Sequence, residues 1–456
     1  MRIKSCFTKL AVVLSSVLVA ACGSNDEHIV STSSDCAITN VALGTLYRTM
    51  HSTTVAGKDT TYTTNFSGRY FPMSIDQQKL EIYNVDSLPI NTHINKTILS
   101  ITADGSISIR PLNAETDIRF SSTDSIDFST PRNFTILSTD GTSKKTYKIK
   151  MNVHQVESEK FTWNLINKTD NNLKECSQQR SFLNNGYIYL FGIENEKAFL
   201  LKASTADELA WEKTEIGNAA SFSISSLQSF DGLFYTLANG LLSTSKDGIS
   251  WNSIQPNLLM DKLVAAGKKE IYGLKDGKLY GSVNGLHWEE QKLDSSFDNF
   301  PTDHLSSISF TSRINKDIEF LLLGGTKGKE SKLWKKENYF TINEITPWSF
   351  CPNTEENKYS LPVLTSLTFL NYDNSQLAIG FQDHNLTPFF LSKDGGLTWI
   401  KSKKTYTLPT SLTPPSNYSC IVDSDNFIWL FCGGTGEVWK GRLNRLGFEN
   451  NSNSFE

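Results

Sequence analysis

Residues 392–399 read Ser392-Lys393-Asp394-Gly395-Gly396-Leu397-Thr398-Trp399, and two shorter versions of this pattern occur earlier in the chain. Residues 245–251 read SKDGISW and residues 282–288 read SVNGLHW. We call the three stretches box 1 (245–251), box 2 (282–288) and box 3 (392–399). Each holds a serine, an aspartate or asparagine two residues later, a glycine and a closing tryptophan. Recurrence of such a pattern indicates an internal repeat.

The residue types in the boxes predict a stapled hairpin turn. The Asp or Asn side chain accepts hydrogen bonds from N–H groups of its own turn, the glycine adopts a positive φ, and the tryptophan folds back into the apolar layer. We therefore expect a structural and not a catalytic role for Ser245, Asp247, Gly248 and Trp251 in box 1, for Ser282, Asn284, Gly285 and Trp288 in box 2, and for Ser392, Asp394, Gly396, Thr398 and Trp399 in box 3.

Weaker copies of the same rhythm, two strand-like runs followed by a turn and an aromatic residue, surround the boxes. Six units of about 45 residues fit between residues 180 and 450, which matches the four-stranded blade of a β-propeller. Residues 161–165 precede the first unit and are expected to complete the last blade, which protects its edge. A seven-bladed ring is the alternative, because residues 340–365 are long enough to hold further strands.

The chain has two unlike parts. All nine tryptophans lie beyond residue 160, and the first third has none. Helical periodicity is weak throughout, and short β-rich runs alternate with Asp-Gly turns at 104–105 and 140–141. The sequence thus predicts an all-β protein with one domain at 36–155, a propeller at 160–450 and a disordered tail at 451–456.

The end of the first domain resembles bacterial immunoglobulin-like lipoprotein domains. The resemblance rests on Asp127-Phe128-Ser129-Thr130-Pro131, on the Asp140-Gly141 turn and on the alternating residues Phe134, Ile136, Tyr147 and Ile149. Alternation of this kind buries one face of a strand pair. The resemblance implies an immunoglobulin-like β-sandwich that serves as a spacer.

The first residues predict an export signal with a lipid anchor. Basic residues precede an apolar run of twelve residues at 10–21, which covers only about 18 Å, less than the ~30 Å of a bilayer core. Leu18-Val19-Ala20-Ala21-Cys22 resembles the lipobox of bacterial lipoproteins, so we expect residues 1–21 to be removed and Cys22 to be acylated. Residues 22–35 would then be a polar tether. Residues 23–27 resemble the surface-export signal of Bacteroidetes lipoproteins, and the periplasmic leaflet of the outer membrane is the alternative location.

Composition limits the partners. Lys and Arg number 44 against 48 Asp and Glu, so the net charge of −4 does not favour nucleic acid. No Cys/His spacing suggests a metal, and no glycine-rich loop suggests a phosphate, so we expect neither metal nor cofactor. Five cysteines fall in the domains, at positions 36, 176, 351, 420 and 432. The last two are either disulfide-bonded across a hairpin or buried free thiols.

The boxes make the second domain resemble sialidase-like propellers with BNR repeats. Sialidases bind a substrate carboxylate with three arginines, and the candidates here are Arg180, Arg313 and Arg442. The chain departs from the family because the R-I-P strand that precedes such sites is missing.

We therefore expect a lipid-anchored, non-enzymatic protein that binds a glycan or an envelope protein through its propeller. Trp348 and the arginines are the candidate ligand-binding residues, since an aromatic ring can stack on a sugar. The competing hypothesis is a glycoside hydrolase of the sialidase type. The resemblance as a whole is to Bacteroidetes surface lipoproteins that have an immunoglobulin-like domain and a propeller.

Overall fold

The computed structural model describes residues 32–53, 58–206, 209–218, 221–342, 345–352 and 357–448. The expected signal peptide, Cys22 and the tail at 451–456 lie outside these residues. The described chain divides into two compact units, and the boundary between them in the sequence lies between Val156 and Glu157. None of the helices in the described part is long and apolar enough to cross a membrane.

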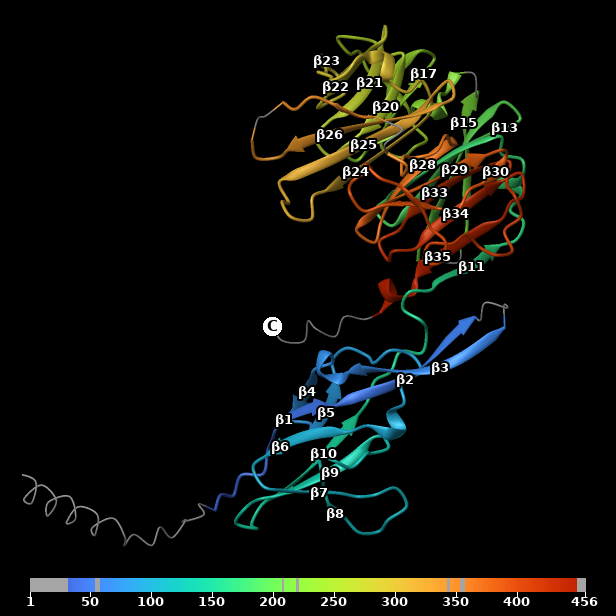
Figure 1. The fold of residues 1–456 in the computed structure, drawn as a ribbon. Helices are drawn as coiled ribbons and strands as arrows, with labels where there is room; N and C mark the ends of the chain where they lie inside the picture. The colour runs from blue at the N-terminus through green and yellow to red at the C-terminus, as the bar shows by residue number, and fades with distance from the viewer. Residues whose placement is uncertain are drawn as a thin grey trace, which may run out of the picture. The chain divides into compact units, whose positions relative to one another are not determined.

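The first unit is built from short strands (Figure 1). They are β1 (Ile38–Leu43), β2 (Thr45–Thr53), β3 (Asp59–Ser67), β4 (Met73–Asp76), β5 (Glu81–Asn84), β6 (Leu99–Ala103), β7 (Ser106–Ile109), β8 (Ile118–Arg119), β9 (Arg132–Leu137) and β10 (Lys144–Lys150). In the described residues, β4-β5-β10-β9-β7-β8 form one sheet, and β1-β6 and β2-β3 form two strand pairs. The pairing of β10 with β5 is parallel.

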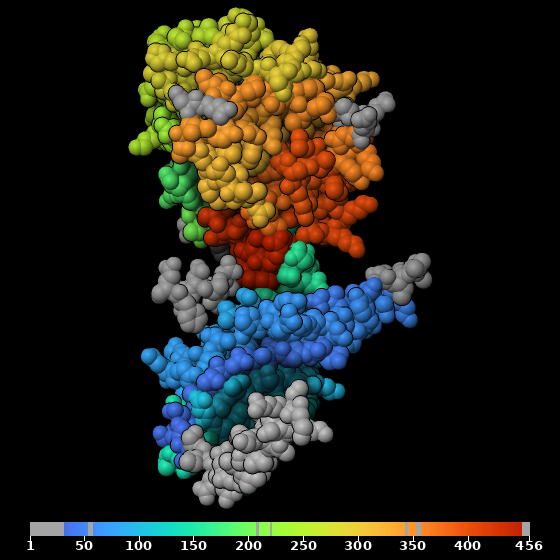
Figure 2. Space-filling model, turned by 60° about the vertical axis from the view of Figure 1, so that its left-hand side comes forward, coloured from blue at the N-terminus to red at the C-terminus, as the bar shows by residue number. Residues whose placement is uncertain are grey.

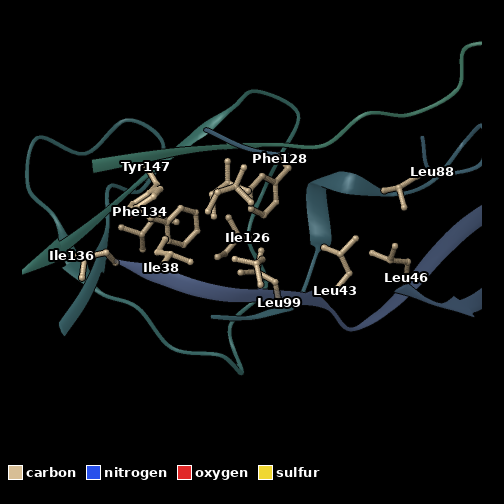
Figure 3. Close-up of a cluster of buried hydrophobic side chains, with 14 of the residues drawn as sticks. Ile38, Leu43, Leu46, Leu88, Leu99, Ile126, Phe128, Phe134, Ile136 and Tyr147 are labelled. Carbon is tan, nitrogen blue, oxygen red and sulfur yellow. The ribbon is translucent and has the colours of Figure 1, made fainter. Parts of the chain in front are cut away.

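One apolar core holds the first unit together (Figure 3). Phe134 and Tyr147, from β9 and β10, are fully buried and lie near Ile38 of β1. Between these two strands the chain turns at Gly141, whose φ is 72°, and the Asp140 carboxylate accepts a hydrogen bond of 2.9 Å from Thr142 N. The alternation expected for Phe134 and Tyr147 thus fills the core, while the Asp-Gly pair makes the turn.

In the described residues of the second unit, six antiparallel sheets follow one another along the chain. The first sheet has β12 (Gln178–Asn184), β13 (Tyr187–Glu194), β14 (Lys197–Ser204) and β15 (Glu212–Asn218), and the second has β16 (Gln228–Phe230), β17 (Leu233–Ala238), β18 (Leu241–Ser245) and β19 (Asn252–Ser253). The third has β20 (Lys262–Ala266), β21 (Ile271–Lys275), β22 (Lys278–Ser282) and β23 (Glu289–Glu290), and the fourth has β24 (Asp303–Thr311), β25 (Ile318–Lys327), β26 (Glu330–Tyr339) and β27 (Ser349–Cys351). The fifth has β28 (Thr365–Tyr372), β29 (Ser375–Gln382), β31 (Phe390–Ser392) and β32 (Ile400–Lys401), with β30 (Asn385–Leu386) beside β29.

The sixth sheet joins the two ends of the unit. Its strands are β33 (Asn417–Val422), β34 (Ile428–Gly433) and β35 (Val438–Leu443), and its outer strand is β11 (Phe161–Asn167), which comes from the start of the unit. Figure 2 shows the green atoms of the first residues beside the red atoms of the last. The pairing of β11 with β35 is the one that the sequence predicts for residues 161–165.

The first strands of the six sheets lie at the middle of the second unit. Among them, β16 contacts β20, β20 contacts β24, β24 contacts β28, β28 contacts β33, and β33 contacts β12. The one short α-helix of the described part, α2 (Asn171–Lys174), precedes β12 and is capped by Asp170. Turns between strands therefore gather at the two ends of this central set, where residues from distant sheets meet.

Candidate functional site

The boxes close on themselves through hydrogen bonds. In box 3 the Asp394 carboxylate accepts from Leu397 N at 3.1 Å and from Thr398 N at 3.0 Å, while Ser392 Oγ accepts from Gly396 N at 2.8 Å. The indole of Trp399 donates to the carbonyl oxygen of Gly396 at 3.0 Å. Gly396 has a φ of 99°, in the region that glycine adopts most readily.

Boxes 1 and 2 have the same geometry. Asp247 and Asn284 each accept two backbone N–H groups, and Trp251 and Trp288 donate to the glycines three residues earlier, at 3.1 and 3.0 Å. Partial burial opposes ionisation of Asp247, but the hydrogen bonds from Ser250 and Ile249 outweigh it and lower the pKa of this carboxyl to about 2. The side-chain oxygens of Asp247 and Asn284 thus accept hydrogen bonds from their own turns.

The three candidate arginines have different surroundings. Arg180, in β12, donates to Ser225 O at 3.3 Å and to Gln228 Oε1 at 3.5 Å. Arg442, in β35, donates to Asp425 O at 3.0 Å, and its guanidinium carbon lies 4.1 Å from the centre of the Phe427 ring. Arg313 is exposed in the turn between β24 and β25 and lines a pocket described below.

Trp348 belongs to the core of the fourth sheet. Its side chain is 0% exposed and meets the Tyr272 ring edge to face, with 5.1 Å between ring centres. Its indole N–H has no hydrogen-bond partner in the described part of the chain. The ring is therefore inaccessible to a ligand, which does not suit the ligand-binding role expected of Trp348 from the sequence.

A pocket of about 510 Å³, which we call the loop pocket, lies where turns from the fourth, fifth and sixth sheets meet. This volume falls within the usual range for small-molecule sites, roughly 300–1,000 Å³. Its lining residues are 310–314, Phe320 and Lys335 from the fourth sheet, 371–374, Gln376 and 393–395 from the fifth, and Asn426 and Leu446 near the sixth.

The loop pocket has an aromatic wall with cations beside it. The rings of Phe310 and Phe320 lie 5.6 Å apart between centres, and Lys335 Nζ lies 4.6 Å from the centre of the Phe320 ring. Lys335 also lies against box 3, because a Cβ built on Gly395 would come within 2.9 Å of its Nζ. Aromatic carbon and positive charge are thus presented side by side.

Several polar groups of the loop pocket have no protein partner. Gln376 is only 4% exposed, yet its side-chain amide makes no hydrogen bond with the described residues. The side chains of Arg313, Asn371 and Asn374 likewise have none within the described ranges. Gln376 is not among the described residues whose side-chain polar atoms are fully buried without a partner, so its amide opens onto the pocket, where a ligand or water can reach it.

A firmly held turn positions one wall of the loop pocket. Asp373 and Asn374 join β28 to β29 with φ values of 50° and 56°, as in a type I′ hairpin. The Asp373 carboxylate accepts a hydrogen bond of 2.5 Å from Tyr406 Oη and forms an ion pair with Arg445. Burial, together with this hydrogen bond, raises the pKa of Tyr406, so the phenol stays protonated and keeps donating.

The sequence singled out Arg313 but not the rest of the loop pocket. Its other residues come from turns far apart in the chain, and only the stacking of sheets brings them together. Within the described residues, no group of His, Cys, Asp and Glu side chains is arranged to hold a metal ion. All five cysteines of the two units are free thiols, including Cys420 and Cys432.

Comparisons with known proteins place both parts of the chain in one family. Residues 157–451 match the model of the DUF6242 beta propeller domain, and residues 41–151 match the model of the DUF6242 N-terminal domain of unknown function. No curated protein matches the chain.

Solved structures with similar folds are distant in sequence. A structural genomics protein of unknown function from Bacteroides thetaiotaomicron is 10% identical, with 81% of this chain and 98% of that chain covered and a TM-score of 0.41. A Trypanosoma rangeli sialidase, in complex with the inhibitor DANA, is 10% identical, with 62% of this chain and 59% of that chain covered and a TM-score of 0.39. A family 117 glycoside hydrolase from Zobellia galactanivorans is 13% identical, with 63% and 91% covered and a TM-score of 0.31. At these scores the likenesses carry no conclusion about activity.

Proposed function

The chain belongs to the DUF6242 family and has its beta propeller domain, and we propose that it is a lipid-anchored, non-enzymatic binding protein of the bacterial cell envelope. Its propeller would capture a glycan in the loop pocket. The observation that carries this proposal is the amide of Gln376, which opens onto the loop pocket without a partner among the described residues, beside an aromatic wall.

The chemistry of the loop pocket suits a sugar. Sugar hydroxyls both donate and accept hydrogen bonds, and an amide such as that of Gln376 or Asn374 can do both in return. The C–H faces of sugar rings pack on aromatic carbon, which Phe310 and Phe320 supply. Arg313 and Lys335 add positive charge at the rim, which favours glycans that carry acidic groups.

The finer architecture is part of the same proposal. The six successive sheets, and the pairing of β11 with β35, support a six-bladed ring closed by its first strand. The bonding inside the boxes supports their assignment as Asp-boxes of the BNR type. The single core of β-strands in the first unit supports an immunoglobulin-like spacer.

The anchor proposal rests on the sequence around Cys22. Acylation of this cysteine would tether the mature chain to the outer membrane, facing the cell surface or, alternatively, the periplasm.

The alternative is a sialidase-like glycoside hydrolase, and the local contacts favour it less. A sialidase needs three arginines on one carboxylate, whereas the candidates here have different surroundings: Arg180 lies near Gln228, Arg313 lines the loop pocket and Arg442 stacks on Phe427. The acids of the boxes accept hydrogen bonds from their own turns. A binding role requires only the residues that line the loop pocket and no catalytic group.

A glycan array tests the proposal. The full chain in mild detergent would be applied to arrayed host and plant glycans, and retained sugars would be recovered and checked for cleavage. Arg313→Ala and Gln376→Leu should each weaken retention about tenfold, because each removes a hydrogen bond to the ligand. Lys316→Ala is the matched control, since Lys316 is exposed in the same turn but does not line the pocket. Cleaved sugars, or full retention by both pocket variants, would contradict the proposal.

A further inference from the structure

A second site is indicated where β12, β16 and β20 begin, at the middle of the propeller domain. Each of these strands places a polar residue at or near its start: Arg180, Gln228 and Lys262. We call these three residues the axial cluster. The rest of β20 is apolar, with Leu263, Val264 and Ala265 buried, so packing does not explain a lysine there.

Arg180 is a poorly satisfied cation. Its two hydrogen bonds, to Ser225 O and Gln228 Oε1, are long at 3.3 and 3.5 Å. Within the described residues no carboxylate lies close enough to pair with it, and one side of the guanidinium faces the Phe182 ring at 5.6 Å. Burial lowers the pKa of Arg180 to about 10, so it stays charged at neutral pH while held in surroundings that disfavour the charge.

Lys262 adds a second uncompensated charge. In the part of the chain that the structure describes, its ammonium group makes no hydrogen bond or ion pair. Burial lowers the pKa of Lys262; the exposed carboxylate of Asp303 opposes this effect and the positive charge of Arg180 adds to it. The two cations therefore lie within electrostatic reach of each other, with one exposed acid nearby.

Gln228 supplies an unsatisfied donor beside these charges. The residue is 4% exposed, its Oε1 faces Arg180, and its Nε2 is buried without a partner in the described chain. Leaving a buried donor unpaired costs about 1–3 kcal/mol, so native proteins rarely keep one without a use. The axial cluster thus offers hydrogen-bond donors from a guanidinium, an ammonium and an amide. All three groups would be satisfied by a negatively charged oxygen acceptor.

We propose that the axial cluster binds the carboxylate group of an acidic small ligand. The guanidinium of Arg180 can hold a carboxylate with two parallel hydrogen bonds, Lys262 supplies a point charge, and Gln228 Nε2 donates to the same group. The bound anion would relieve the repulsion between the cations and satisfy the buried amide. No bond is made or broken in this step.

The axial cluster is separate from the loop pocket. Asp303, whose charge acts on Lys262, is the first residue of β24, whereas Thr311, which lines the loop pocket, is the last. A strand of this length spans roughly 26 Å. The inference therefore does not depend on the glycan proposal, and either can fail alone.

Calorimetric titration of the full chain tests the inference, with succinate as the carboxylate probe and succinamide and inorganic phosphate for comparison, because none of these is a sugar. Succinate should bind, succinamide should not, and added salt should weaken binding. Arg180→Gln, Lys262→Gln and Gln228→Leu should each weaken binding about tenfold or more. Lys278→Gln is the matched control, because Lys278 lies in the same sheet but is exposed and paired with Glu290.

Two further measurements separate the outcomes. Thermal melting shows whether each variant is folded, and Arg180→Lys, which keeps the charge but loses the fork, should bind more weakly than the native chain in a folded protein. Arg313→Ala separates the two sites: loss of succinate binding in this variant, with native affinity in Arg180→Gln, would place the carboxylate in the loop pocket and overturn the inference. Equal binding of succinamide and succinate, binding of phosphate alone, no binding at all, or native affinity in both Arg180→Gln and Lys262→Gln would each overturn the inference.

Discussion

The indole Nε1 of Trp399 donates a hydrogen bond of 3.0 Å to the carbonyl oxygen of Gly396, three residues earlier in the chain. Trp251 and Trp288 make the same bond to Gly248 and Gly285. Each box thus ties its turn to the apolar layer with a single side chain that is both core residue and hydrogen-bond donor. Since the polar side chains of each box form their hydrogen bonds within the box, substituting them should affect stability more than ligand binding.

Asp247 offers a test of that role. Its pKa of about 2 lies below the usual 3.8, so its ionised form contributes stability above pH 3.8 that is lost as the pH falls toward 2. Asp247→Asn should fold normally, as the Asn284 of box 2 does, and should lose this part of the acid dependence. Asp247→Ala should cost about 1–2 kcal/mol at neutral pH, because two N–H groups lose their acceptor. Urea unfolding at neutral and acid pH measures both, and an acid response unchanged in Asp247→Asn would contradict the assignment.

Buried side chains of β11, the strand that pairs with β35, should contribute more to stability than its exposed ones. Phe161 is 6% exposed and packs 5.9 Å from the Tyr372 ring, so Phe161→Ala should lower the free energy of unfolding by about 3–5 kcal/mol. Leu165, in the same strand, is 41% exposed, and Leu165→Ala should cost little. Thermal melts compare the two, and size-exclusion chromatography detects the self-association expected if β35 loses its partner. Equal effects of the two substitutions would argue against a structural role for β11.

Local patterns predicted the local structure well. The boxes could be read from sequence because Ser, Asp, Gly and Trp interact within eight residues, and β11 could be read because a propeller must protect its last edge. Trp348 could not, since the sequence around it has no periodicity and its burial depends on Tyr272, from another sheet. Of the axial cluster, the sequence analysis named Arg180 but neither Gln228 nor Lys262, because a lysine or glutamine at the start of a strand usually lies in water.

Trp348 should behave as a core residue. Trp348→Ala should destabilise the protein by about 3–5 kcal/mol, because it empties a fully buried site. Trp348→Phe should cost less, since the indole N–H has no partner to lose and an aromatic ring can still meet Tyr272. Tyr359, which is 46% exposed, provides the control substitution Tyr359→Ala, which should be neutral. Chemical denaturation measures the differences, and a folded Trp348→Ala of native stability would show that the ring is not part of the core.

Lys262 should reduce stability in the absence of ligand. Its charge is partly buried without an ion pair in the described chain, so Lys262→Met should raise the melting temperature at neutral pH. The pKa of Lys262 is lower in the folded protein than in the unfolded chain, so the unfolded chain binds the ammonium proton more tightly. The free energy of unfolding should therefore rise as the pH approaches 10.5, the ordinary pKa of lysine. Lys262→Met should lack this rise, whereas Lys278→Met should keep it. A lower melting temperature in Lys262→Met would mean that the ammonium stabilises the free protein.

The proposed lipid anchor at Cys22 can be tested by substitution. Two or more acyl chains on this residue would hold the chain in a bilayer, because each buried CH₂ contributes about 0.8 kcal/mol and a single chain gives only reversible binding. Expressed in a bacterium that processes lipoproteins, the native chain should partition into the detergent phase and Cys22→Ala into the aqueous phase. Cys6→Ala is the matched control, because Cys6 precedes the expected cleavage point and should leave anchoring unchanged. Mass spectrometry of the mature N-terminus gives an independent readout, and a Cys22→Ala protein that still enters detergent would place the anchor elsewhere.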